Sequence, residues 1–184
     1  MDGDKWHGVT TSLGYHRINT KHDEPSNVQQ YKLPYKLENI IEEQVEERLK
    51  LGIIEESISD YNCPLYVVPR KHDDRTINNK WRVVTDLRKL NEATVLEDFP
   101  MPTINELFDR IGTGNKYFIK LDLRNGFMQI PVDPRDRHKM AFSTHHGKYQ
   151  FRTMTFGMKN SPFFFQRAMT KVLKPLLNKG VTVY

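Results

Sequence analysis

Residues 117–123 constrain the fold more than any other stretch of this chain, because their side chains alternate with a period of two. Four large apolar side chains share one parity: Tyr117, Ile119, Leu121 and Leu123. The alternation predicts a β-strand with one face against a core, and Asn125-Gly126 predicts a turn after it. Asp122 then lies near the strand's end, where a carboxylate suits a hard divalent cation such as Mg²⁺. A solvated residue at the end of a strand explains Asp122 equally well.

Size and composition narrow the class of protein. The 184 residues can bury a core and fit one or two domains. A formal net charge of +5 permits binding to a polyanion without demanding it. Cys63 is the only cysteine, which excludes an intramolecular disulfide and a cysteine-rich metal site. No apolar run approaches the roughly 18 residues of a membrane span, and the chain has no apolar signal segment at its start. We therefore expect an intracellular protein with no membrane partner.

The first half predicts a helix followed by a charged β-hairpin. Apolar residues within 37–49 fall on one stripe, and Gly52 is placed to end that helix. Strands over 64–69 and 81–86 flank the polar segment 70–80. Four cations therefore share this projecting ribbon: Arg70, Lys71, Lys80 and Arg82. Cations on a hairpin are suited to gripping phosphates, although composition alone favours a solvated hairpin tip.

The second half predicts one short helix and two more strands. Thr103 and Glu106 have the spacing of a capping box, and Gly112 is placed to end the helix that they open. Strands are expected over 140–143 and 148–152, joined by a turn.

The two ends of the chain carry weaker signals. Residues 1–30 are polar and lack periodicity, which predicts a tail or linker, although for 16–20 an extended strand on the body is an equally good interpretation. Ser161 is expected to cap a helix with Pro162 at its first position. Residues 181–184 read as a short apolar strand.

One motif carries a family resemblance. Residues 120–123 (Lys-Leu-Asp-Leu) followed by 126–130 (Gly-Phe-Met-Gln-Ile) resemble the first catalytic motif of reverse transcriptases from gypsy-type long-terminal-repeat retrotransposons. Further segments resemble the family in the same order: 64–68, 81–84 and 86–91 its fingers, and 156–166 its template- and nucleotide-facing motif. In that family a tyrosine such as Tyr184 opens the motif Tyr-x-Asp-Asp, so we expect a chain truncated just before Asp-Asp.

The resemblance implies an α/β (α+β) fold with the fingers and a partial palm of a right-hand polymerase, including an antiparallel sheet. The implied division of the chain is as follows: residues 1–30 an N-terminal tail or linker, 31–97 fingers, 98–129 palm with the first catalytic motif, 130–159 the second part of the fingers, and 160–184 an incomplete palm.

The resemblance also assigns site residues. Asp122 would be the catalytic carboxylate and a ligand of Mg²⁺ or Mn²⁺, assisted by the carbonyl of Leu123; two metal ions would need two further aspartates that this chain lacks. Phe127 would be the aromatic gate against a ribose 2′-hydroxyl. The expected nucleotide-binding residues are Arg70, Lys71, Lys80, Arg82, Arg124, Asn125, Gly126, Phe127 and Gly157. The expected template–primer residues are Asn160, Ser161, Pro162 and Gln166.

The function that the resemblance implies is RNA-directed DNA polymerisation by two-metal nucleotidyl transfer in the parent enzyme. Its partners would be an RNA or DNA template–primer, deoxynucleoside triphosphates, and the thumb, ribonuclease H and integrase parts of a Pol polyprotein. The location would be cytoplasmic, in a virus-like particle of the parent element, or nuclear. With one carboxylate, we expect the chain by itself to be inactive. Two alternatives stay open: a non-catalytic nucleic-acid-binding module and a degenerate retroelement remnant.

Overall fold

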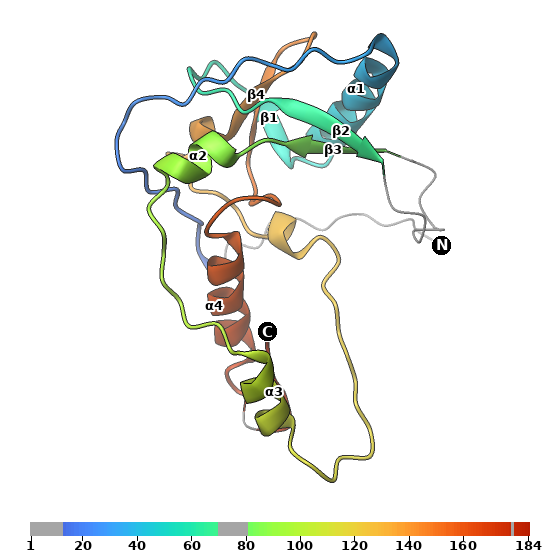
Figure 1. Cartoon of the computed structure of the whole chain (residues 1–184), viewed down its shortest axis with the longest axis vertical. Helices are drawn as coiled ribbons and strands as arrows, with labels where there is room; N and C mark the ends of the chain where they lie inside the picture. The colour runs from blue at the N-terminus through green and yellow to red at the C-terminus, as the bar shows by residue number, and fades with distance from the viewer. Residues whose placement is uncertain (1–12, 70–80, 178) are drawn as a thin grey trace.

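The computed structural model describes residues 13–69, 81–177 and 179–184. Both β-sheets, α1 and α2 lie in the upper half of Figure 1, whereas α3, α4 and the C-terminus lie in the lower half. None of the helices within the described ranges is long and apolar enough to cross a membrane.

Two antiparallel sheets form the upper half. The three-stranded sheet has the order β1-β5-β4, with bounds β1 (Ile54–Glu56), β5 (Lys148–Phe151) and β4 (Ala141–Ser143). The second sheet pairs β2 (Leu65–Pro69) with β3 (Trp81–Thr85), with Leu65 opposite Thr85. These strands confirm the predictions from residues 64–69, 81–86, 140–143 and 148–152, and with them the mixed fold class.

Helix α1 (Tyr35–Lys50) joins the two sheets, because it contacts both β1 and β3. Its apolar stripe buries Ile41 and Val45, as the spacing predicts. The helix ends at Lys50 with Leu51 as its cap residue, and Gly52 follows with φ +68°, the left-handed conformation that glycine adopts without steric cost.

The remaining helices are α2 (Arg88–Ala93), α3 (Ile104–Ile111), α4 (Ser161–Leu173) and the short 3₁₀ helices η2 (Gly126–Gln129) and η3 (Arg137–Met140). The capping box of α3 is confirmed: the Thr103 hydroxyl accepts from the Glu106 amide at 3.3 Å, and the Glu106 carboxylate accepts from the Thr103 amide at 2.7 Å. At α4 the cap residue is Asn160, one position before the predicted Ser161. Ser161 cannot cap because its hydroxyl donates to the Thr155 carbonyl at 3.3 Å.

The N-terminal segment, residues 13–30, lies along the body and reaches three distant regions. Single β-bridges join His16 to Val132, Thr20 to Thr94, and Asn27 to Asn62. His16 and Ile18 are only 1% and 2% exposed, and Ile18 belongs to the hydrophobic core. Residues 16–20 therefore match the alternative of an extended segment on the body.

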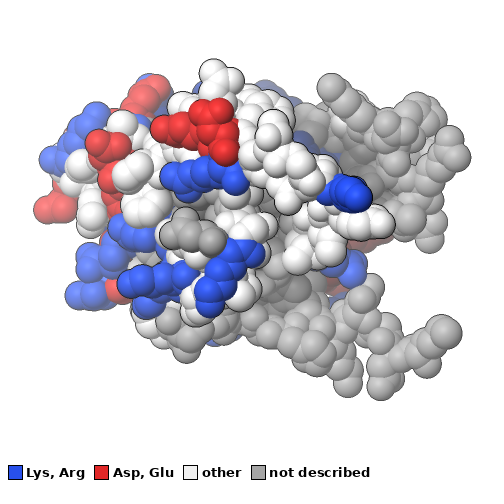
Figure 2. Space-filling view, turned by 90° about the horizontal axis from the view of Figure 1, so that it is seen from below, with Lys and Arg blue, Asp and Glu red and all other residues white. Residues whose placement is uncertain are grey.

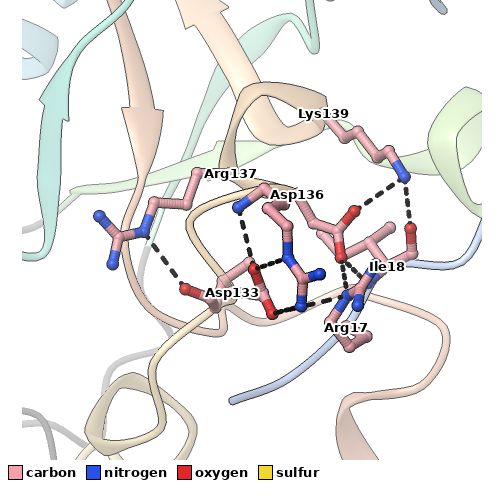
Figure 3. Close-up of polar contacts among 8 residues, drawn as sticks. Arg17, Ile18, Asp133, Asp136, Arg137 and Lys139 are labelled. Carbon is pink, nitrogen blue, oxygen red and sulfur yellow. Dashed lines mark hydrogen bonds and ion pairs between the residues drawn. The ribbon is translucent and has the colours of Figure 1, made fainter.

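A buried carboxylate fixes this segment in place (Figure 3). Asp136 accepts hydrogen bonds from Arg17 Nε at 2.6 Å, from the Ile18 amide at 3.0 Å and from Lys139 Nζ at 3.0 Å. Lys139 also donates to the Ile18 carbonyl at 2.6 Å. Nearby, Asp133 is paired with Arg135 at 2.8 Å. Because a buried charge needs partners, this network holds Arg17 and Ile18 against the turn before η3.

The prediction of a strand over residues 117–123 is wrong. No helix or strand covers residues 114–123, hereafter the open segment, which forms a long excursion between α3 and η2 in Figure 1. Four apolar side chains that alternation predicts to be buried are exposed instead: Tyr117 91%, Ile119 88%, Leu121 87% and Leu123 47%. The physical reason is that, among the described residues, no strand offers the open segment a hydrogen-bonding partner. The predicted strand over 181–184 is likewise a single bridge between Val181 and Leu177.

Candidate functional site

The turn after the open segment brings two predicted site residues against α4. Asn125 adopts the left-handed conformation, with φ 49° and ψ 40°, and η2 begins at the next residue. A Cβ built on Gly126 would lie 2.8 Å from Cζ of Phe165, so a larger residue would collide with α4. The Phe127 ring packs edge-on against Phe165 at 5.3 Å and against Phe156 at 5.2 Å. Phe127, Phe156 and Phe165 form the aromatic cluster.

Asp122 and Leu123 lie at the end of the open segment. Asp122 is exposed and has no hydrogen bond or ion pair within the described ranges. The Leu123 carbonyl accepts from the Gly126 amide at 3.2 Å, and the Arg124 carbonyl accepts from Gln129 Nε2 at 2.8 Å. The carboxylate is therefore accessible, whereas the backbone after it is fixed by the turn.

The loop beside the aromatic cluster is held by α2. Gly157 has φ +87° and is exposed, next to Phe156 in the chain. Asn91 donates from Nδ2 to the Gly157 carbonyl at 2.7 Å and accepts from the Lys159 amide through Oδ1 at 2.8 Å. One amide side chain thus fixes the loop on both sides of Met158. The structure therefore brings Gly126, Phe127 and the loop of Gly157 to one place.

Of the four residues predicted to contact the template–primer, three are buried and one is exposed. Asn160 is 2% exposed; it accepts from the Glu97 amide at 3.1 Å and donates to the Val95 carbonyl at 2.8 Å. Gln166 is 6% exposed and donates to the Val183 carbonyl at 3.0 Å. Ser161 is buried, and Pro162 is exposed. The contacts of Asn160 and Gln166 stabilise the fold and do not test binding to a template–primer. That role therefore stays a prediction for all four residues.

Of the four cations predicted on the charged hairpin, only Arg82 lies within the described residues. Arg70, Lys71 and Lys80 lie outside the described residues. Arg82 is exposed on β3, opposite Val68 of β2. Figure 2, seen from below, shows Lys and Arg side chains gathered over the left half of that face, with Asp and Glu mostly toward its upper edge. The face of the molecule seen from below therefore carries a basic surface, hereafter the basic lower face.

A two-metal centre does not fit the described residues alone. In those parts of the chain, no group of three or more His, Cys, Asp or Glu side chains could hold a metal ion. Asp122 offers one hard oxygen ligand, whereas two clamped cations need about three carboxylates.

The cluster formed by Tyr31, Asp86 and Arg88 was not predicted. Arg88 Nη2 lies 2.6 Å from Asp86 Oδ2, and the Tyr31 hydroxyl donates to the same oxygen at 2.7 Å. The hydrogen bonds from Arg88 hold the pKa of Asp86 well below its usual range. This cluster joins the lead-in to α1 with the start of α2. Tyr31 and Asp86 are separated by 55 positions in the chain, so no local pattern indicates their contact.

A protein-family model covers more than half of the chain. Residues 69–184 match the model described as reverse transcriptase (RNA-dependent DNA polymerase).

Curated relatives agree with this match. The chain is 45% identical over 169 residues to the "Retrovirus-related Pol polyprotein from transposon 297" of Drosophila melanogaster, covering 92% of the chain and 16% of that protein. It is 38% identical over 167 residues to the Pol polyprotein from transposon gypsy of the same species, covering 91% of the chain and 16% of that protein. The chain therefore spans about a sixth of these relatives, and the predicted resemblance to gypsy-type elements is confirmed.

Solved structures are similar too. The native crystal structure of Prototype Foamy Virus protease–reverse transcriptase has a TM-score of 0.75 and 28% identity, covering 92% of this chain and 22% of that chain. The foamy viral protease–reverse transcriptase in complex with an RNA/DNA hybrid has a TM-score of 0.73 and 25% identity, with the same coverage. The predicted polymerase fold is confirmed by these neighbours.

Proposed function

The chain belongs to the reverse transcriptase (RNA-dependent DNA polymerase) family, and from that premise we propose that it forms the nucleotide- and template-facing part of an RNA-directed DNA polymerase. One observation carries the proposal. The accessible carboxylate of Asp122 is followed at once by a left-handed turn that presses Gly126 and Phe127 against Phe165. Only four residues of chain thus separate the Asp122 carboxylate from the Phe127 ring, which is held in place by its neighbours.

Phe127 is the residue to which we assign discrimination between nucleotides. Two rings fix its position, at 5.2 and 5.3 Å, so it cannot swing away from a ligand that approaches its exposed edge. A rigid wall rejects an additional hydroxyl more strongly than a mobile one does, because yielding costs packing energy. A ribose 2′-hydroxyl is the group that would meet such a wall.

The proposed partners are an RNA or DNA template–primer and a deoxynucleoside triphosphate. The foamy viral relative was solved with an RNA/DNA hybrid, which supports this proposal. Arg82 and the basic lower face supply cations for a phosphate backbone. In the parent Pol polyprotein, the thumb, ribonuclease H and integrase parts would be further partners of this chain.

Metal dependence is general in this family. Mg²⁺ or Mn²⁺ would supply the charge that stabilises the transferred phosphoryl group. This chain's contribution would be the Asp122 carboxylate, with the Leu123 carbonyl beside it. Since the described residues offer no set of three ligands, we assign no catalytic step to the chain by itself.

The lack of a three-ligand set in the described residues also favours a second candidate, a nucleic-acid-binding module without catalysis. Such a module would bind nucleic acid through the same basic surface, but its binding would not depend on a nucleotide.

A binding experiment separates the two functions. A fluorescent RNA/DNA hybrid is titrated with the chain, followed by anisotropy, with no nucleotide, with the complementary dNTP, and with a non-complementary one. If the polymerase proposal is right, only the complementary dNTP should strengthen binding of the native chain to the hybrid. In the Phe127→Val variant, the matching rNTP should strengthen that binding as well. Equal affinity under all three conditions would favour the simple binding module. Tyr66→Val, at an exposed position of β2, is the matched control.

A further inference from the structure

Residues 155–159, hereafter the Phe156 loop, are held by side chains on both sides of Phe156. Ser161, the first residue of α4, donates from its hydroxyl to the Thr155 carbonyl at 3.3 Å. Asn91, on α2, donates from Nδ2 to the Gly157 carbonyl at 2.7 Å. The Phe156 ring is 56% exposed, so core packing alone does not orient it. Its direction therefore depends on the backbone that these two side chains fix.

Asn91 makes the larger share of this hold. Its Oδ1 also accepts from the Lys159 amide at 2.8 Å, so one side chain binds the loop at two points. The loop binds α2 in return, because Lys159 Nζ donates to the carbonyls of Thr94 and Asn91 at 3.0 and 3.4 Å. Met158 is 6% exposed and belongs to the hydrophobic core. Helix α2 and the Phe156 loop are thus locked together, although Asn91 and Gly157 are 66 positions apart in the chain.

The Phe156 loop bears on Phe127, the ring to which we assign discrimination between nucleotides. Phe127 has two aromatic supports: Phe156 at 5.2 Å with an interplanar angle of 60°, and Phe165 at 5.3 Å and 89°. Phe165 belongs to α4, whose own backbone hydrogen bonds fix it. Phe156 lies in a turn and reaches Phe127 through the loop that Asn91 holds. Loss of the Asn91 bonds therefore weakens one of the two supports of Phe127.

We propose that Asn91 is a positioning residue for the choice between deoxyribonucleotides and ribonucleotides. Its amide holds the Phe156 loop, the loop holds the Phe156 ring against Phe127, and Phe127 then resists an added 2′-hydroxyl. Asn91 acts through these rings and does not need to touch the nucleotide. The inference rests on the proposed function, because it deepens the role assigned to Phe127.

Amide hydrogen exchange tests the coupling without any nucleotide. Asn91→Ala removes both loop bonds, and Asn91→Leu removes them while keeping the branched shape of the side chain. In both variants the Lys159 amide, which loses its acceptor, should exchange about fivefold faster. The Ile130 amide, which donates to the Phe127 carbonyl at 3.1 Å, should also exchange faster, because Phe127 has lost one support. Glu92→Gln, which changes a surface ion pair on the same helix, is the matched control and should leave both amides at their native rates.

Hybrid binding tests the consequence for nucleotide choice. Fluorescence anisotropy gives the affinity for an RNA/DNA hybrid with the complementary dNTP, with the matching rNTP and without nucleotide. In the native chain and in Glu92→Gln, only the dNTP should strengthen binding. In Asn91→Ala the preference for the dNTP over the rNTP should fall about tenfold. Because Asn91 acts through Phe156, Asn91→Ala should lower the preference no further in a Phe156→Ala background.

The two measurements together decide the role of Asn91. Faster exchange at Ile130, with a loss of preference that is not additive with Phe156→Ala, supports positioning. Three results overturn it, since Asn91 would then only stabilise the fold: faster exchange confined to Lys159, additive losses of preference, or unfolding of both Asn91 variants by circular dichroism. A native chain that responds to no nucleotide refutes the proposed function instead, and the exchange rates then decide the coupling of Asn91 to Phe127 on their own.

Discussion

At Gly126 the chain has room for a hydrogen atom and nothing larger. A methyl group there would meet Cζ of Phe165 at 2.8 Å and Cε2 at 3.0 Å. The ring has little freedom to retreat, since it also packs against Phe127 at 5.3 Å. The glycine therefore sets how closely the turn after Asp122 approaches α4.

Gly126→Ala should lower the free energy of unfolding by about 1–3 kcal/mol, the usual cost of overpacking. Urea denaturation followed by circular dichroism measures this loss. Phe165→Leu removes the ring atoms that collide, so the double variant should lose less than the sum of the two single losses. Strict additivity would show that the two residues do not collide.

Asp136 is a buried carboxylate whose charge is expected to stabilise the fold. Burial alone raises its pKa, but the hydrogen bonds from Arg17, Lys139 and the Ile18 amide outweigh burial, and the pKa is lowered. A carboxyl with a lowered folded pKa adds stability above its unfolded pKa of about 3.9. That stability is lost as the pH falls below this value toward the folded pKa.

Asp136→Asn should therefore cost about 3 kcal/mol at neutral pH, because it leaves Arg17 and Lys139 without their buried anion. Below about pH 4 the native chain loses this advantage, so the two stability curves should converge. Denaturant unfolding at a series of pH values measures both curves. Asp133→Asn is the control with a smaller expected loss, since its partner Arg135 is 72% exposed. Parallel curves down to low pH would contradict the assignment.

At the scale of elements, the sequence predicts those helix ends and strands that depend on neighbouring residues in the chain. The capping box of Thr103 and Glu106, the glycine ends of α1 and α3, and the alternating strands of both sheets all have signals within a few residues. The open segment shows the limit of such signals. Alternation of apolar and polar side chains indicates that a segment is able to form a β-strand. The strand itself forms only where a neighbouring strand supplies hydrogen bonds.

The same limit applies to the candidate site. The Gly-Phe pair after Asp122 could be predicted from its motif. The aromatic cluster could not, because Phe127 meets Phe156 and Phe165 only when η2 docks onto α4. Asn160 was assigned to the template–primer, yet its amide joins Glu97 and Val95 to the start of α4.

Asn160→Ala should remove two buried hydrogen bonds and cost about 2–3 kcal/mol of stability. Asn160→Asp keeps the acceptor for the Glu97 amide, but its charged form sets a buried carboxylate oxygen against the Val95 carbonyl. Its loss should therefore be at least as large at neutral pH, and smaller at a pH where the carboxyl is protonated and can donate. Thermal unfolding compares the three chains. Unchanged stability combined with weakened binding to an RNA/DNA hybrid would instead place Asn160 at the template.

At the scale of the whole molecule, Arg82 and the basic face seen from below offer cations to a phosphate backbone. Hybrid binding should fall as salt rises, because each neutralised phosphate releases counterions. Arg82→Ala should reduce the slope of log affinity against log salt by about 1. Lys50→Ala, within the acidic helix α1, is the control and should leave the slope unchanged. Affinity that is flat across the salt series would exclude a basic groove.

The chain by itself should not extend a primer when Mg²⁺ or Mn²⁺ is added. One accessible carboxylate cannot position two cations, and comparable losses at catalytic sites cost several kcal/mol of transition-state stabilisation. Gel electrophoresis of a labelled primer measures extension, with an intact reverse transcriptase as positive control. Metal-dependent extension that Asp122→Asn abolishes would show that the 184 residues suffice.

The docking of the N-terminal segment also orders events during synthesis. The Lys139 ammonium that binds the Ile18 carbonyl is made 121 residues after Ile18. Until then residues 16–18 lack the partners that hold them, Val132, Asp136 and Lys139, and stay open to chaperones and proteases. Residues 16–18 therefore dock only after η3 has been made, and a bulky insertion close before His16 should slow maturation more than one placed after Tyr184.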